Sequence, residues 1–176
     1  MGNIISLNPI DKHVSALSLT NGLTSAFIST LVLSGSSLAK TENEKGWVVW
    51  LAEHDQGVFG PGMVGFSINE MPWTAAGFEK ERAFLLAVID GVLARSGWDR
   101  LGHKPAEDSL FAALRKFCEI MKQMRPSDIS KEIHQEWLRD LADYGVAPGF
   151  PTCTEHQVIL HLGGCVICNE HQTAEQ

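Results

Sequence analysis

Residues 153–168 read CTEHQVILHLGGCVIC, and this stretch holds three of the four cysteines in the chain. Cys153 and His156 form one pair, Cys165 and Cys168 form a second, and two residues separate the members of each pair. Such spacing lets a tight turn point both side chains of a pair at one ion, and thiolate and imidazole groups are usual ligands of tetrahedral zinc sites. We therefore predict that these four side chains bind one Zn²⁺ ion.

The pattern C-x2-H-x8-C-x2-C resembles a zinc ribbon or zinc knuckle over about residues 150–170 and nowhere else in the chain. The residues between the pairs are enough for a short hairpin: alternating apolar side chains predict a strand at 157–162, and Gly163-Gly164 allows a tight turn into the second pair. Zinc held by four protein ligands has no open coordination position for a substrate, so the predicted role of the metal is structural.

The fourth ligand has alternatives. His161 and His171 lie close enough in the sequence to replace His156, which we rank first because its spacing matches that of the second pair. A catalytic zinc of the deaminase kind is not supported at the cysteine pair, because that signature has proline before its C-x-x-C and this chain has Gly164.

The rest of the chain is long enough to form a core that does not depend on the metal. With 176 residues, of which 44% are hydrophobic and 20% charged, the composition is that of an ordinary globular protein. Pro148 and Pro151 separate the last helical pattern from the ligand segment. We predict an α+β domain in residues 1–149 and a zinc-ribbon hairpin in residues 150–176, packed on the same domain.

Much of residues 1–149 shows the three- and four-residue spacing of apolar side chains that is typical of helices. One helix is predicted to begin at Asn8-Pro9 and to kink or break at Asn21-Gly22. Four further helices are predicted at about residues 23–35, 78–95, 106–124 and 130–144.

Two apolar runs between these helices predict strands. Trp47–Ala52 is continuously apolar and rich in aromatic and β-branched residues, and Met63–Ile68 follows it after a polar loop. We expect the two runs to pair as an antiparallel hairpin, and residues 169–176 to form a frayed polar tail. The predicted fold is therefore α+β, with helices packed on a small antiparallel sheet and a C-terminal zinc-ribbon hairpin.

The charge distribution limits the classes of partner. The net charge is −7, and residues 126–176 hold eight acidic but only two basic side chains. No Lys or Arg accompanies the ligand segment, so we do not expect it to contact nucleic-acid phosphates. A protein partner with a basic surface fits this balance better. Arg115, Lys116 and Lys122 leave a nucleic-acid-associated regulator as an alternative.

A small hydrolase-like enzyme is a second alternative. His54, Asp55 and Glu70 lie near the ends of the two predicted strands, where catalytic groups are often placed. A histidine beside carboxylates can act in acid–base chemistry, so these three residues are the candidates for catalysis. No G-x-S-x-G or P-loop motif points to a specific reaction.

Cysteine usage indicates a reducing, cytoplasmic setting, because three of the four thiols belong to the metal pattern and the one that remains cannot build a disulfide scaffold. Cys118 falls in a helical pattern and is expected to be a buried free thiol. Met1–Ser6 fits a myristoylation pattern without a basic neighbour, and Leu23–Leu33 is too short to span a membrane. We expect no membrane association, and leave open whether residues 1–39 are processed.

Together these observations favour a non-enzymatic, intracellular zinc-binding interaction protein of the adaptor, inhibitor or immunity type. The metal pattern is specific because four ligand-type residues occur at paired spacing. The assignment to an interaction protein rests on composition, and no motif in residues 1–149 names a partner.

Overall fold

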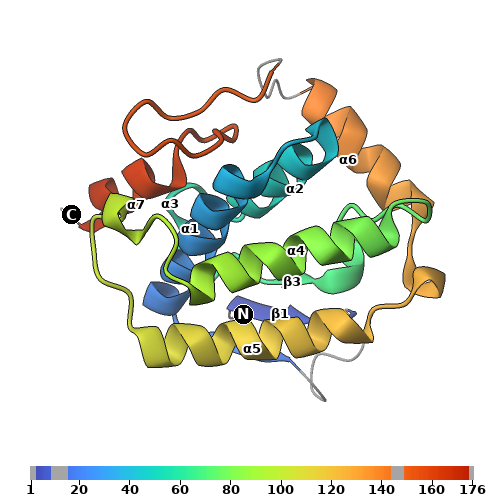
Figure 1. Cartoon of the computed structure of the whole chain (residues 1–176), viewed down its shortest axis with the longest axis horizontal. Coiled ribbons are helices and arrows are strands. Elements are labelled where there is room, and N and C mark those ends of the chain that lie inside the picture. The colour runs from blue at the N-terminus through green and yellow to red at the C-terminus, as the bar shows by residue number, and fades with distance from the viewer. Residues whose placement is uncertain (1–2, 9–15, 144–148, 175–176) are drawn as a thin grey trace.

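The computed structural model describes residues 3–8, 16–143 and 149–174, with side chains as far as residue 170. Within these ranges seven α-helices pack with a small sheet of three strands, which confirms the α+β class (Figure 1). The strands are β1 (Asn3–Ser6), β2 (Leu17–Leu19) and β3 (Phe66–Ser67). The helices are α1 (Asn21–Leu38), α2 (Glu42–Ala52), α3 (Gln56–Phe59), α4 (Phe78–Leu93), α5 (Glu107–Gln123), α6 (Lys131–Asp143) and α7 (Val166–Ala174).

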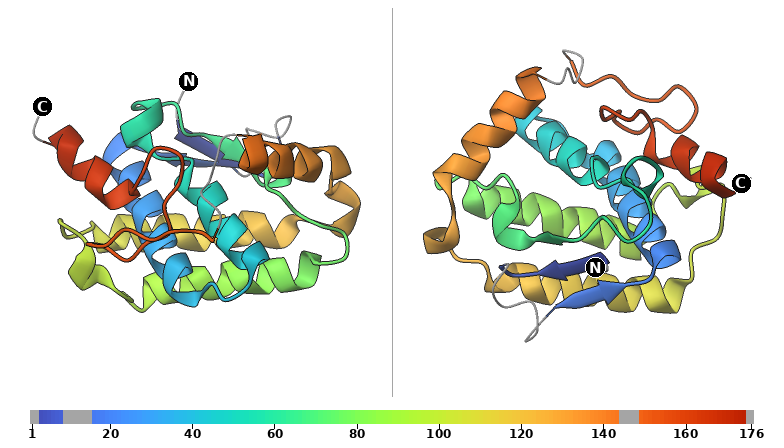
Figure 2. Two further views of the ribbon diagram at one scale, coloured as in Figure 1. Left: turned by 90° about the horizontal axis from the view of Figure 1, so that it is seen from above. Right: turned by 180° about the vertical axis from the view of Figure 1, so that it is seen from behind.

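The sheet is mixed, with the strand order β2-β1-β3. β1 pairs with β2 in the antiparallel sense and with β3 in the parallel sense, where Ile5 lies opposite Phe66. The Ser6 and Ser67 hydroxyl oxygens lie 3.1 Å apart across the parallel pair. The sheet lies beside α5 (Figure 2). The expectation of a purely antiparallel sheet therefore holds for only one of the two strand pairs.

Helix α1 is the centre of the core and contacts α2, α4, α5 and α7. Most of its residues from Thr24 to Gly35 are buried, as expected for a helix that is covered on all sides. Two glycines allow neighbouring helices to approach closely: a Cβ atom at Gly35 would lie 2.8 Å from Val48 Cγ2, and one at Gly91 in α4 would lie 2.2 Å from Ser34 Oγ. The helix predicted at 23–35 is thus confirmed, and it forms the core.

Trp47–Ala52, which is predicted to be a strand, is instead helical and belongs to α2. The helix begins upstream in the polar stretch, where Thr41 and Glu44 form a capping box that satisfies backbone N–H groups at its start. All of Trp47–Ala52 is buried. A helix turn that is buried all round and a buried strand give the same apolar run, so the pattern alone could not separate them.

The predicted hairpin is consequently absent, because β3, within Met63–Ile68, pairs with β1 instead. The predicted frayed tail at 169–176 is also wrong, since residues 166–174 form α7. In place of a strand at 157–162 the structure has the isolated bridges Thr152–Ile159 and His161–Gly164.

The other helix predictions are confirmed by α4, α5 and α6. The helix predicted to begin at Asn8-Pro9 falls largely on residues 9–15, outside the described residues, and Leu17–Leu19 is a strand. No helix in the described ranges is both long and apolar enough to cross a membrane.

Candidate metal centre

Four side chains gather at the C-terminal end of the chain, and they are the four predicted from the sequence. Cys153 and His156 lie on a turn, Cys165 immediately precedes α7, and Cys168 lies in its first turn. His156 Nδ1 is 3.7, 3.6 and 3.4 Å from the Sγ atoms of Cys153, Cys165 and Cys168. All four ligand-type atoms lie within 4.8 Å of one another.

These separations fit a tetrahedral metal ion. With metal–sulfur bonds of about 2.3 Å and metal–nitrogen bonds of about 2.0 Å, the edges of the tetrahedron are roughly 3.8 Å between sulfurs and roughly 3.5 Å between sulfur and nitrogen. The Cys153 and Cys168 sulfurs are 3.9 Å apart, close to the first value and far beyond a disulfide bond of about 2.05 Å. The cluster can therefore hold a metal ion with three sulfur ligands and one nitrogen ligand.

The first ligand pair is positioned by a tight backbone turn. Cys153 N–H donates to Val158 O (2.8 Å), Gln157 N–H donates to Cys153 O (2.8 Å), and Gln157 adopts a left-handed conformation with φ of 55°. His156 N–H also points at Cys153 Sγ, 3.5 Å away. This turn brings the thiol and the imidazole to the same side of the chain.

The second pair is positioned by the N-terminus of α7 rather than by a second hairpin knuckle. Asn169 N–H donates to Cys165 O (3.0 Å), which places Cys165 and Cys168 on the first turn of the helix. The N-terminal end of a helix carries a partial positive charge that favours thiolates. The ligand segment is therefore a turn followed by a helix, and only its first half matches the predicted ribbon hairpin.

The thiols have different acidities without a metal ion. Burial raises the pKa of Cys165 to about 12 and also raises that of Cys168. Burial also disfavours the Cys153 thiolate, but hydrogen bonds from the backbone of His156 and Glu155 outweigh it and lower the pKa of Cys153 to about 7. A bound cation would favour all three thiolates, as coordination of a thiol by a metal does in general.

Arg100 supplies a positive charge that the sequence analysis missed. Its Nη1 donates to the carbonyl oxygen of His156 (3.0 Å), and its Nη2 donates to Ser37 Oγ at the end of α1 (3.2 Å). Three thiolates around a divalent ion leave one net negative charge, and residues 150–176 contain no Lys or Arg to offset it. Arg100, from the turn that follows α4, is thus the nearby cation that holds the ligand turn.

His161, a predicted alternative ligand, is not part of the cluster. Its Nδ1 accepts a hydrogen bond from Gly163 N–H (3.2 Å), so its Nε2 carries the proton and donates to Asp55 Oδ2 (3.3 Å). Both ring nitrogens of His161 already take part in hydrogen bonds, and the His161 side chain is only 2% exposed. The other alternative, His171, lies in α7, and its side chain is outside the described residues.

Asp55 joins the ligand segment to α3. Its Oδ1 accepts from Gly57 N–H (2.7 Å) at the start of α3, and its Oδ2 accepts from Asn169 Nδ2 (2.7 Å) as well as from His161. Asn169 directly follows the ligand Cys168. The carboxylate therefore fixes α7 and the loop before it relative to α3.

The structure does not bring the three candidate catalytic residues together. His54 Nδ1 donates to Trp50 O (2.8 Å), and burial lowers the pKa of His54 to about 4, so the ring is neutral near pH 7. Glu70 accepts from Ser67 N–H (2.7 Å) and caps a turn. Among the described residues no hydrogen bond or ion pair connects His54, Asp55 and Glu70 with one another.

Two further sequence features lie away from the metal centre. Lys116, one of the basic residues of α5, pairs with Glu119 on the same helix (Nζ to Oε2, 3.7 Å). The sequence was predicted to hold no H-x-E element of the zinc-deaminase kind, and this is wrong, because His134-Gln135-Glu136 has that spacing. It lies on α6, where His134 Nδ1 donates to Pro72 O (3.0 Å), and it takes no part in the cluster.

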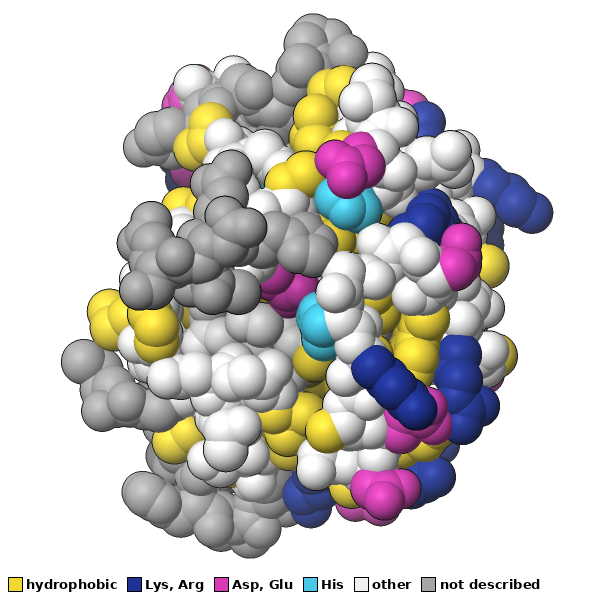
Figure 3. Space-filling model, turned by 90° about the vertical axis from the view of Figure 1, so that its left-hand side faces the viewer, with side chains coloured by type: hydrophobic (Ala, Val, Ile, Leu, Met, Phe, Trp, Pro, Cys, Tyr) yellow, Lys and Arg dark blue, Asp and Glu magenta, His cyan; other side chains and the backbone are white. Residues whose placement is uncertain are grey.

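A cavity of about 550 Å³ adjoins the ligand segment, and no sequence motif indicated it. Val58 and Phe59 of α3 and Leu162 line it with apolar side chains that are 50%, 57% and 63% exposed. Glu53 and Asp140 line it with carboxylates. Figure 3 shows the side of the molecule that carries α7, where hydrophobic side chains are visible between polar groups and charged side chains gather toward one edge.

Protonation of Glu53, which lines this cavity, should make the stability of the folded protein depend on pH. Burial raises the pKa of Glu53 to about 7, and the charge of Asp140 adds to the effect. Because the folded state keeps a proton that the unfolded chain releases between about pH 4.5 and about pH 7, the free energy of unfolding should fall as the pH rises through this window. His161 also lines the cavity.

Glu53→Gln should remove this dependence, so the variant should gain stability relative to the wild type between about pH 5 and about pH 8. Urea unfolding of both proteins at several pH values measures the difference. Glu136→Gln, at a glutamate with a 65% exposed side chain on α6, is the matched control. Parallel pH profiles for wild type and Glu53→Gln would contradict the assignment.

The features that define the candidate metal centre are three thiols, one imidazole, a cation on the ligand turn and a buried carboxylate that fixes α7. Comparison with models of protein families, with curated proteins and with solved structures finds no match to the chain.

Proposed function

We propose that this protein is a non-enzymatic, zinc-binding interaction protein of the cytoplasm, acting as an adaptor, an inhibitor or an immunity-type protein. Three sulfur ligands and one nitrogen ligand at tetrahedral separations suit Zn²⁺, and thiolate ligands suit a reducing compartment. The protein itself supplies all four ligands, so the zinc has a structural role. It holds the turn at Cys153 against the start of α7.

The observation that carries the interaction role is the exposed apolar lining of the cavity beside this centre. Val58, Phe59 and Leu162 present large apolar side chains to solvent at one place, which is a feature of protein-binding surfaces. Leu162 lies on the loop between the two ligand pairs, so the metal centre positions part of this surface. We call this set, with Glu53 and Asp140, the acidic-apolar surface.

The chemistry of the acidic-apolar surface selects a type of partner. Among the described residues neither Glu53 nor Asp140 forms an ion pair, so both can accept a Lys or Arg of a partner at this cavity. The apolar side chains next to them suit a large apolar residue of the same partner segment. A short basic and apolar peptide segment of another protein therefore fits better than a nucleic acid, whose phosphates would be repelled by the carboxylates.

The alternatives receive less support from the structure. The hydrolase-like reading requires His54 to exchange protons, but its ring is buried and neutral with Nδ1 bound to Trp50 O. The regulator reading requires a continuous basic face on α5, but Lys116 is paired with Glu119.

Selection from a random peptide library displayed on phage tests the proposed function. Zinc-loaded protein should enrich peptides that combine Lys or Arg with large apolar residues, and a synthetic peptide of the consensus should bind at least tenfold more weakly to Leu162→Asp. Met63→Asp is the matched control, because Met63 is as exposed as Leu162 (63%) but does not line this cavity. Enrichment of acidic peptides, or equal binding by Leu162→Asp, would contradict the proposal.

A further inference from the structure

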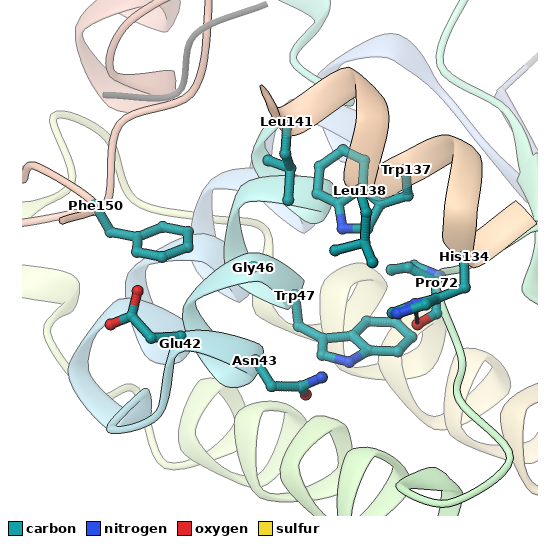
Figure 4. Close-up of a pocket in the computed structure, with 10 residues that line it drawn as sticks. All are labelled: Glu42, Asn43, Gly46, Trp47, Pro72, His134, Trp137, Leu138, Leu141 and Phe150. Carbon is teal, nitrogen blue, oxygen red and sulfur yellow. Dashed lines mark hydrogen bonds between the residues drawn. The ribbon is translucent and has the colours of Figure 1, made fainter. Parts of the chain in front are cut away.

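A second cavity, of about 320 Å³, lies between α2 and α6. Figure 4 shows its walls: Trp137, Leu138 and Leu141 extend from α6, Trp47 lies on the α2 side, and the ring of Phe150 faces the space from the other end. The volume is within the range of sites that take small organic ligands. We call this space the α2–α6 cavity.

Gly46 indicates that the space is a feature of the fold rather than a packing defect. It lies in the interior of α2, where glycine destabilises a helix relative to alanine. Gly35 and Gly91 have a steric reason, since a Cβ atom at either would collide with a neighbour. Gly46 is buried, yet a Cβ atom there would meet nothing within 4 Å. Its missing side chain therefore leaves room beside the α2 backbone, on the wall of the cavity.

Phe150 is held over the cavity in an unfavourable backbone conformation. Its φ of 50° is in the left-handed region, which a bulky aromatic residue rarely adopts. Lys45 Nζ lies 5.9 Å from the centre of its ring, a cation–π contact that helps to fix the ring. Strained residues that the surroundings hold in place are common at ligand sites.

The charges at the cavity select a neutral ligand. Glu42 is the only charged residue that lines it among the described residues, and Lys45 Nζ lies 3.1 Å from its carboxylate. His134 donates through Nδ1 to Pro72 O, so Nε2 is the ring nitrogen that remains to contact a ligand. The aromatic rings favour stacking or edge contacts with another ring.

We propose that the α2–α6 cavity binds a neutral aromatic small molecule, which packs against the Gly46 backbone and between Trp47, Trp137 and Phe150. This site is separate from the metal centre and from the acidic-apolar surface. Its occupancy would brace α6, whose one buried residue in the described structure is Trp137.

Fluorescence titration of the full chain with N-phenyl-1-naphthylamine, a neutral aromatic probe, tests the proposal, with indole and 2-naphthol as competitors. We expect saturable binding of one probe per chain with a Kd below about 100 µM. Gly46→Leu should fill the opening and weaken binding at least tenfold. Gly22→Leu is the matched control, because Gly22 is also a helical glycine without neighbours within 4 Å but lies at the start of α1.

A wild-type measurement covers the case in which Gly46→Leu does not fold. The backbone amide signal of Gly46 should shift on addition of indole in a ¹H–¹⁵N correlation spectrum, while that of Gly22 should not. Absence of saturable binding by all three aromatic compounds, binding by folded Gly46→Leu equal to wild type, or unchanged Gly46 amide signals at saturation would each overturn the proposal.

Discussion

Replacing Cys165 with serine is expected to reduce the metal content from one ion per chain to nearly none. The Cys165 side chain is buried at the centre of the ligand cluster, and three remaining ligands bind zinc far more weakly than four. Native mass spectrometry and elemental analysis of the purified protein measure the stoichiometry. Cys118→Ser is the matched control, because Cys118 is the one cysteine outside the cluster and should leave the metal content unchanged.

The structural effect of Cys165→Ser should be local. Helices α1, α2, α4 and α5 supply most of the core residues, while the ligand segment and the start of α7 add only Val158, Ile159, Cys165, Val166 and Ile167, so the four helices should retain their amide protection. Amides of residues 150–170 and of α7 should exchange much faster, because the metal site joins their two halves. A wild-type protein without metal, or a Cys165→Ser protein that retains a full ion, would refute the metal centre.

Asp55→Ala should have the second-largest effect, a loss of about 3 kcal/mol in the free energy of unfolding. The change removes the acceptor of the buried His161 Nε2–H and one of the two acceptors of Asn169 Nδ2, the other being Gly163 O (3.1 Å), and it removes the N-cap of α3. Because Asn169 follows the ligand Cys168, metal affinity should also fall, by about 10- to 100-fold as for other residues that support metal ligands.

Chemical denaturation and competition with a chromophoric chelator measure the two effects of Asp55→Ala. The exposed Asp108 on α5 provides the control, since Asp108→Ala should change stability by no more than about 0.5 kcal/mol and leave metal affinity unaffected. If Asp55→Ala kept the metal affinity of the wild type, the carboxylate would stabilise α3 without supporting the metal site.

The parts of the structure that were predicted correctly depend on local signals. The spacing of the two ligand pairs is local, and so is the apolar pattern of α4 and α5. Trp47–Ala52 was assigned to a strand because burial on all sides erases helical periodicity, and the capping box at Thr41 and Glu44 was the signal that could have corrected it.

The parts that were missed depend on contacts between distant residues. Arg100 reaches the ligand turn across 56 positions, and Asp55 meets His161 across 106. No local pattern reports such pairs, and the two cavities arise from how α6 and the C-terminal loops pack on α2 and α3. The acidic-apolar surface could therefore be identified only from the folded structure and not from the sequence.

The serine residues at the end of α1 have a consequence for the order of folding. Ser36 Oγ accepts from Ile159 N–H (2.9 Å), and Ser37 Oγ accepts from Arg100. These groups come into position only once α1 and the turn after α4 are formed, and the first of the two bonds closes a loop of more than a hundred residues. We therefore expect metal capture to be a late step, and in refolding experiments metal uptake should lag behind the tryptophan fluorescence change of the core.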